Sequence, residues 1–409
     1  MSDKVTLPNN LSTIRARGPI IGVAGLVVGV VLSLLFGGIH YFFEAFLYSF
    51  WILLGLSLGS LAFLMIHHMT AGAWSFVSQR IFEAMMRTLP VLIVGFVVVI
   101  MTGPLFGLNN LYDSWVIEEN HSHIVGKKAD FLNPDFWTLR SLAYFIIWGL
   151  IIVAFNRWSR RLEETGDALI TLKFRFWAPV CLIIYCITMT FAGTDWAMSL
   201  EPEWFSTMYG PLTWISQGLT VLAFTILILS SLAEEKPLSR YITVEHYHTL
   251  ATLMCAFVVL WAYMSFSQFL IIWAGNLPEE ISYYLHRRTG YYQVIIFLLM
   301  VGHFLLPLLV LLQRKIKYSL PKLRMVCYWM LGMRLVDVFF LINPAFHYGD
   351  PSFPWRDLIV HAFVLVGFGG IYMWYFLGQL TKMPLLPMND PRLYKAVGYG
   401  EDEEAMEHA

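Results

Sequence analysis

The sequence predicts an all-α integral membrane protein whose chain crosses the bilayer ten times. Of its 409 residues, 58% are hydrophobic and 13% are charged, whereas soluble proteins carry roughly 25% charged residues. The apolar residues form continuous runs of about 20, the length that a helix needs to cross the hydrocarbon core. A membrane β-barrel would instead show strands of roughly ten residues with alternating polarity. Helices are therefore expected, because a helix satisfies its backbone hydrogen bonds within its own segment.

The first span is the apolar run from Pro19 to Ile39, which follows Lys4, Arg15 and Arg17. No small-residue cleavage site follows a short apolar core, so this run is expected to be a retained helix and not a signal peptide. In chain order, the expected spans are about 19–40, 45–67, 89–111, 137–155, 176–198, 209–232, 248–274, 291–313, 323–343 and 357–380.

Spans two to five and six to nine suit two four-helix bundles, over about 45–198 and 209–343, with the first and last spans flanking them. The third and seventh spans end in similar stretches that begin at Gly107 and Gly275. This echo favours a repeat, although Gly and Asn are also ordinary helix caps. The membrane domain would then cover 19–380, between an N-terminal segment, 1–18, and a tail, 381–409, that is expected to be flexible or held by a partner.

The distribution of cations predicts the orientation. Twenty of the 27 lysines and arginines fall in segments that share a side with the N-terminus, and only Arg334 falls within a span. Cytoplasmic loops carry the excess of positive charge, so both termini are expected to be cytoplasmic. The six cations on the opposite side are Lys127, Lys128, Arg140, Arg287, Arg288 and Arg356.

Composition also narrows the function. A net charge of −1 without a basic arm gives no reason to expect nucleic-acid binding. The four cysteines lie in apolar runs, and no C-x-x-C-H motif or cysteine cluster is present. Covalently bound haem c, an iron–sulfur cluster and a metal site are therefore not expected in this chain. Any electron carrier would be non-covalent or would belong to another subunit, and the histidines lie at depths too poorly matched for haem b.

The most informative polar residues lie inside expected spans. A charge at the bilayer centre costs at least ~2.5–3.5 kcal/mol, and such residues face the bundle interior. Arg334 and Asp337 are three residues apart and share a helix face, so they can form an ion pair. His303 lies midway along the eighth span. The pair and the histidine are either structural or part of a proton route, for which Asp195, His248 and His361 are further candidates.

Polar residues gather toward the expected outer side. The candidates for quinone binding or for an outer docking face are Asp113, Asp195, Glu201, Glu203 and Gln268. His40 and Glu44 also fall on this side, but a wet interfacial position is the simpler interpretation for both.

The stretch Asp195–Gly210, DWAMSLEPEWFSTMYG, resembles a signature of alternative complex III, a quinol:cytochrome c oxidoreductase. Specifically, it is similar to the second NrfD-like (polysulfide-reductase-anchor-like) membrane subunit, the ActF family. The ten spans, the short basic inner loops and the chain length extend the resemblance over essentially the whole sequence. In that setting Asp195, Glu201 and Glu203 would lie at an outer proton exit or on a partner face.

The resemblance implies a bacterial inner-membrane subunit of a respiratory electron-transport complex. It would sit beside a sister NrfD-like subunit, an iron–sulfur subunit and haem c subunits. The complex would oxidise quinol, usually menaquinol, and pass electrons to a cytochrome c or a similar carrier. This chain would hold no metal centre of its own, and quinone binding and proton translocation are expectations for it.

Two other functions remain open. The chain could be a passive membrane anchor for an external redox module, with its buried charges purely structural. It could also be a secondary transporter, but paired broken helices at the midplane are expected of such a fold. Only Gly103-Pro104 and the stretch from Gly302 to Pro307 are weak candidates for such breaks.

Overall fold

The computed structural model describes residues 7–107, 111–117, 122–236, 238–288, 290–347 and 352–393. Over these residues the chain is all-α, and ten helices are long and apolar enough to cross a membrane, which confirms the predicted fold class. The spans are α1 (Asn9–Phe36), α2 (His40–Thr70), a third composed of α3 (Ala73–Met86), α4 (Leu89–Gly95), the π-helical turn η1 (Phe96–Ile100) and α5 (Thr102–Phe106), α8 (Pro134–Thr165), α9 (Ala168–Trp196), α10 (Tyr209–Leu232), α12 (Val244–Gly275), an eighth composed of α14 (Tyr292–Leu298), the π-helical turn η4 (Leu299–Leu305) and α15 (Leu306–Leu312), α17 (Leu320–Ile342) and α18 (Trp355–Leu380).

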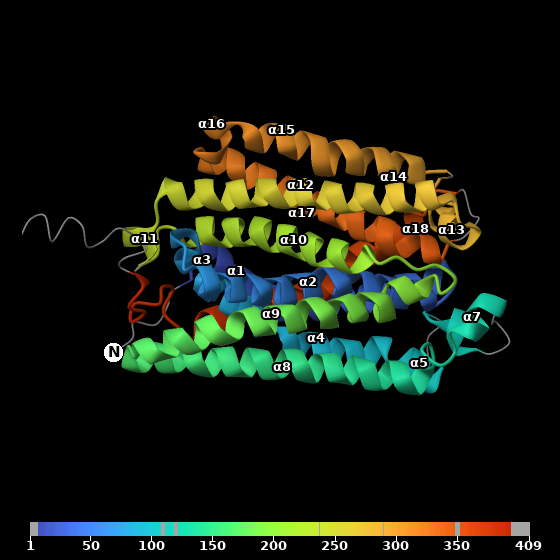
Figure 1. Cartoon of the computed structure of the whole chain (residues 1–409), viewed down its shortest axis with the longest axis horizontal. Helices are drawn as coiled ribbons and strands as arrows, with labels where there is room; N and C mark the ends of the chain where they lie inside the picture. Colours follow the sequence, from blue (N-terminus) through green and yellow to red (C-terminus); the bar gives the residue numbers. More distant parts are fainter. Residues whose placement is uncertain are drawn as a thin grey trace, which may run out of the picture.

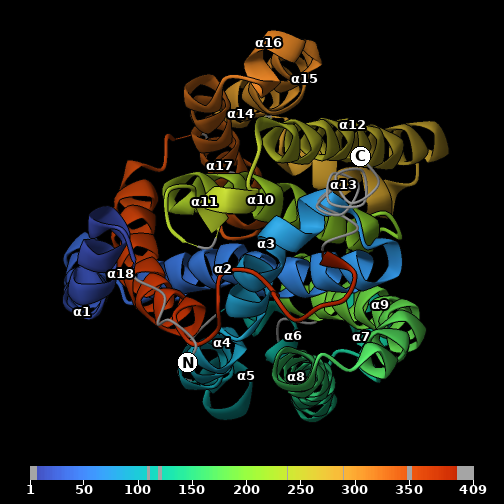
Figure 2. The ribbon, with the colours of Figure 1, turned by 90° about the vertical axis from the view of Figure 1, so that its left-hand side faces the viewer.

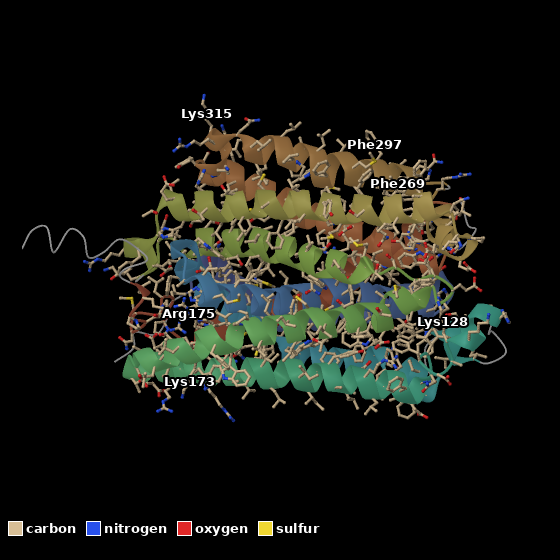
Figure 3. All side chains as sticks on the ribbon, viewed as in Figure 1. Lys128, Lys173, Arg175, Phe269, Phe297 and Lys315 are labelled. Carbon is tan, nitrogen blue, oxygen red and sulfur yellow. The ribbon has the colours of Figure 1, made fainter. Side chains whose placement is uncertain are left out.

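The long helices lie side by side along the long axis of the molecule (Figure 1). The short helices α11 (Leu238–Tyr241) and α16 (Arg314–Lys317) mark one end, which we call the terminal face because α1 begins and α18 ends there. The opposite end, the distal face, carries α7 (His123–Lys127) and α13 (Pro278–His286), and α6 (Asp113–Val116) follows the third span there. Lys173, Arg175 and Lys315 lie toward the terminal face, and Lys128 lies at the distal face (Figure 3).

Two groups of four spans surround a shared centre. In the first group α2 packs against α3 and α9, and α9 packs against α8; in the second α10 packs against α12 and α17, and α12 packs against α15. The first helix of each group, α2 or α10, is buried over most of its length, and these two helices pack against each other. Figure 2 shows this arrangement end-on.

The flanking spans α1 and α18 form a pair of their own beside α2 (Figure 2). Glycines at 18, 22, 25 and 29 form the buried stripe of α1 and let the two backbones approach closely. A Cβ on Gly25 would lie 2.7 Å from the Cα of Gly367, closer than real Cβ contacts. Small residues at regular spacing are a common basis of helix association in membranes. Because α1 starts at Asn9, part of the expected N-terminal segment 1–18 is helical.

The third span starts at Ala73, so the expected boundary of 89 was wrong. Three charged residues between 80 and 87 made this stretch resemble a loop, but they neutralise one another inside the fold. The Arg80 guanidinium lies 2.8 Å from the Glu83 carboxylate and 2.5 Å from that of Glu163. Arg87 lies 3.2 Å from the same Glu83 carboxylate. The helix can bury this network because every charge has a partner.

The tail packs on the terminal face as far as residue 393. Leu385, Leu386 and Leu393 are buried there, and the Asn389 amide donates to the Glu163 carbonyl at 2.5 Å. Residues 381–393 of the tail, which was expected to be flexible or held by a partner, pack on the bundle of the chain itself, because these leucines bury apolar surface there. Residues 394–409 lie outside the described residues.

Candidate functional site

The Arg334–Asp337 ion pair lies inside the protein. Both side chains project from α17 and are buried, and the guanidinium donates directly to the carboxylate. Asp337 is five residues from the distal end of α17, or about 8 Å at the helical rise. The Tyr48 hydroxyl on α2 donates to the Leu335 carbonyl at 3.0 Å, so the pair lies against the central helix of the first group.

His303 is the buried histidine closest to this pair along the bundle. It lies in the π-helical turn η4, which packs against α17, and its side chain is fully buried. Its ring packs at a tilt against Trp261 with 4.1 Å between the centroids, and neither ring nitrogen has a hydrogen-bond partner within the described chain. π-helical turns occur frequently at functional sites. A buried imidazole with two unsatisfied nitrogens is poised to take up water or to exchange a proton.

His361 continues the polar groups toward the distal face. Its Nδ1 lies 2.6 Å from the Asp357 carbonyl on α18. Its ring packs edge-on against Tyr48, with 4.8 Å between centroids. The structure therefore brings three of the sequence-derived candidates, Asp337, Arg334 and His361, around Tyr48, which sequence analysis did not single out.

Three side chains that sequence analysis did not combine meet where α2, α17 and α18 reach the distal face. We call Glu44, His347 and Asp357 the distal cluster; their ligand atoms all lie within 4.8 Å of one another. The His347 Nε2 lies 3.3 Å from an Asp357 carboxylate oxygen and 3.7 Å from one of Glu44. Burial lowers the pKa of His347, but attraction to the two carboxylates beside it outweighs this effect and raises the pKa to about 10.

The expected wet position of Glu44 was wrong, because only 4% of this residue is exposed. A usable signal was present in the sequence. Glu44 begins the second span, and His347 and Asp357 lie on either side of the connection between the last two spans. The start of the second span and the connection between the last two spans lie on the same side of the membrane in the expected topology. The topology therefore predicts that Glu44, His347 and Asp357 share one face of the bundle.

Asp195 lies in a separate ion pair, which we call closed because the hydrogen-bonding capacity of its carboxylate is largely filled by its partners. Its carboxylate accepts two hydrogen bonds from Arg140, at 2.9 and 2.8 Å, and one from the Tyr144 hydroxyl at 2.7 Å. The Arg140 guanidinium is also held between the rings of Phe131 and Phe136, 3.8 and 4.3 Å from their centroids. A carboxylate with three donors fixes the end of α9 to α8 and has little capacity left for proton exchange.

Glu201 forms a second closed pair at the distal face. Its carboxylate accepts from the Arg287 guanidinium at 2.5 and 3.2 Å and contacts the His286 ring at 3.1 Å. Arg287 is wholly buried and also donates to the carbonyls of Tyr283, Phe340 and Leu341. Burial raises the pKa of Glu201, but the charge of Arg287 and the hydrogen bonds outweigh it, so the net pKa is lowered.

The remaining candidates are dispersed. Glu203 is exposed, and its carbonyl accepts from Lys128 at 3.4 Å. Gln268 is buried, and its amide oxygen accepts from the Ser206 hydroxyl at 3.3 Å. Asp113 opens α6 and is half-buried. His248 lies near the terminal face, where its ring packs at a tilt against Tyr318.

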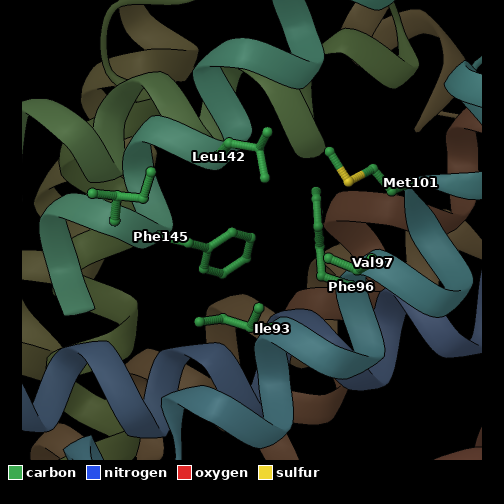
Figure 4. Close-up of a pocket in the computed structure, with 7 residues that line it drawn as sticks. Ile93, Phe96, Val97, Met101, Leu142 and Phe145 are labelled. Atoms are coloured by element: carbon green, nitrogen blue, oxygen red, sulfur yellow. The ribbon is translucent and has the colours of Figure 1, made fainter.

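An apolar cavity of about 190 Å³ lies between the third span and α8 (Figure 4). It opens on the lipid-facing side of the bundle, where Val97, Leu142 and Ile146 are exposed. No polar side chain lines it, so it suits a hydrocarbon chain and offers nothing to a quinone headgroup. Its lining residues are Ile93, Phe96, Val97, Met101, Leu142, Phe145 and Ile146.

Within the described chain, the site is thus a set of buried ionisable groups around α2, α17, η4 and α18 that do not take part in the two closed ion pairs. Histidine and carboxylate side chains are the groups that most often accept and release protons in proteins. No protein-family model matches the chain, and no curated protein matches it.

Proposed function

We propose that this chain is the proton-handling membrane subunit of a quinol:cytochrome c oxidoreductase of the alternative complex III type. It would support quinol oxidation and move protons without a redox metal of its own. Electrons would pass through iron–sulfur and haem c groups in partner subunits. The electron acceptor would be a cytochrome c or a similar carrier.

One observation carries this proposal: buried ionisable groups follow one another from the bundle interior to the distal face. Asp337 lies about 8 Å from the distal end of its helix, and His361 and Tyr48 lie beside the same helices. His361 contacts the Asp357 carbonyl, and the Asp357 carboxylate contacts His347. Buried ionisable groups in membrane helices are expensive and are retained for transport or relay roles.

The chemistry fits this order. Oxidation of a quinol to a quinone removes two electrons and releases two protons, so a complex that oxidises quinol in the membrane needs proton acceptors. A proton that reaches Asp337 neutralises the carboxylate and releases Arg334 from its partner. The ion pair is therefore a two-state element whose arrangement changes with proton occupancy. His303, with two unsatisfied nitrogens, is positioned on the neighbouring helix to exchange a proton with it.

The same proposal fixes an orientation in a bacterial inner membrane. Lys173, Arg175 and Lys315 lie toward the terminal face (Figure 3), which supports placing that face in the cytoplasm. The distal face would then carry the iron–sulfur and haem c subunits. A sister NrfD-like subunit would lie alongside the bundle within the membrane.

Replacing Asp337 by Asn tests the proposal. In the intact complex, reconstituted in vesicles, we expect quinol turnover coupled to proton movement to fall at least ~100-fold, the usual scale for losing a positioned proton-transfer group. Asp390→Asn is the matched control, because Asp390 also pairs with an arginine, at 2.7 Å, and lies outside the membrane spans. Normal turnover and normal proton coupling in an assembled Asp337→Asn complex would refute the relay.

A passive anchor is the second candidate, and the two closed ion pairs favour it. Asp195 and Glu201, for which the resemblance implies an outer proton exit or a partner face, each form an ion pair with an arginine. If every buried charge served packing in this way, Asp337→Asn would lower the stability of the subunit and leave proton coupling intact.

A further inference from the structure

The distal cluster differs from every other buried acid described above in what balances its charge. Asp195 and Glu201 each have a guanidinium partner. Among the described residues, no lysine or arginine forms a salt bridge with Glu44 or Asp357, and His347 is the only cationic partner of both. Within salt-bridge distance, the two buried carboxylates therefore share at most one positive charge, and buried charges are stable only when they are compensated.

We propose that Glu44, His347 and Asp357 form a binding site for a divalent cation, Zn²⁺ being the ion that fits it best. A divalent ion would replace the proton on His347 and balance both carboxylates.

The spacing of the donor atoms fits this ion. Ligands at about 2.0–2.1 Å from a tetrahedral Zn²⁺ lie roughly 3.3–3.4 Å from one another. The His347 Nε2 lies 3.3 Å from Asp357 and 3.7 Å from Glu44, close to that spacing, and all three donor atoms lie within 4.8 Å of one another. One nitrogen and two carboxylate oxygens are ordinary zinc ligands, and three protein ligands leave a fourth position for water.

A second observation points independently to a ligand. The facing oxygen of Glu44, the Nε2 of His347 and one carboxylate oxygen of Asp357 are all buried, and none has a hydrogen-bond partner within the described chain. The side chains of Glu44 and Asp357 are 5% and 3% exposed. Buried polar atoms in native proteins are nearly always satisfied, by protein, water or an ion. The His347 side chain, at 19% exposed, leaves the cluster an opening toward the distal face.

A zinc-binding measurement on the purified full-length chain in detergent tests the proposal. We expect one tightly bound Zn²⁺ per chain in a chelator-buffered titration. His347→Ala and Glu44→Gln should each lower the affinity at least ~100-fold, since loss even of an outer-shell partner costs 10–100-fold. His286→Ala is the matched control: His286 also contacts a distal-face carboxylate, but Arg287 already neutralises it, so the affinity should not change.

X-ray absorption of the zinc-loaded wild-type chain provides a readout that does not depend on a variant folding. We expect nitrogen and oxygen neighbours at about 2.0–2.1 Å with one imidazole. Sulfur neighbours, the absence of saturable binding, or unchanged affinity in a folded Glu44→Gln variant would each overturn the proposal. Because the isolated chain is used and no proton movement is measured, failure here leaves the relay at Asp337 untouched, and failure of the Asp337 test leaves this site untouched.

Discussion

Replacement of Arg287 by Met should destabilise the protein severely. The guanidinium is fully buried and supplies the main compensating charge for Glu201, while also donating to three backbone carbonyls. Breaking a buried ion pair by removing one partner costs about 3–5 kcal/mol, because an uncompensated charge remains. The contact of Glu201 with His286 offsets a part of this loss, so we expect a value of about 3 kcal/mol.

The assay is thermal or denaturant unfolding of the purified protein in detergent. Arg288→Met is the matched control: the neighbouring arginine is exposed, and its loss should change the free energy of unfolding by less than about 0.5 kcal/mol. Adding Glu201→Gln to the Arg287→Met chain removes the stranded charge and should recover part of the loss. Equal stability of the Arg287→Met and Arg288→Met chains, or no recovery in the double variant, would refute this view of the pair.

Three further outcomes are expected. The folded-state pKa of Glu201 lies below the unfolded value of 4.5, so the stabilisation by this carboxylate should be complete above pH 4.5 and be lost as the pH falls through the folded pKa. Unfolding of wild type and Glu201→Gln as a function of pH checks this. A difference in the free energy of unfolding that stays constant down to pH 3 would contradict it. Gly367→Ala should lower stability by about 1–3 kcal/mol, because its Cβ would lie 2.6 Å from the backbone of α1. Gly369→Ala is the control and should not lower stability, because its Cβ would meet nothing within 4 Å. Equal melting temperatures of the two variants would count against the close α1–α18 contact. Asp195→Asn should cost about 3 kcal/mol of stability and leave the number of protons moved per electron unchanged, and an altered proton count in vesicles would return Asp195 to the proton route.

Hydropathy predicted the fold because backbone groups in the hydrocarbon of a bilayer must be hydrogen-bonded within the protein. Ten apolar runs of sufficient length became ten helices, since no other open structure satisfies the backbone in hydrocarbon. The boundary of the third span failed for a related reason. Arg80 and Glu83 count as polar in a hydropathy profile, yet in the fold they neutralise each other. A hydropathy profile scores each residue alone and does not include the partner that it meets in the folded protein.

The candidate site was predictable only in part. Arg334 and Asp337 could be paired from sequence because both lie on one face of one helix. Asp195 and Glu201 could not be recognised as closed, because their partners, Arg140 and Arg287, come from other helices. The distal cluster depends in the same way on three separate helix ends meeting.

The most direct test of the central claim is the number of protons moved per electron by the intact complex in vesicles, compared between wild type and Asp337→Asn at equal subunit assembly. The proton path predicts that the variant loses proton movement while Asp390→Asn retains it. An unchanged ratio at a normal rate of quinol oxidation would show that Arg334 and Asp337 serve only to hold α17 in place.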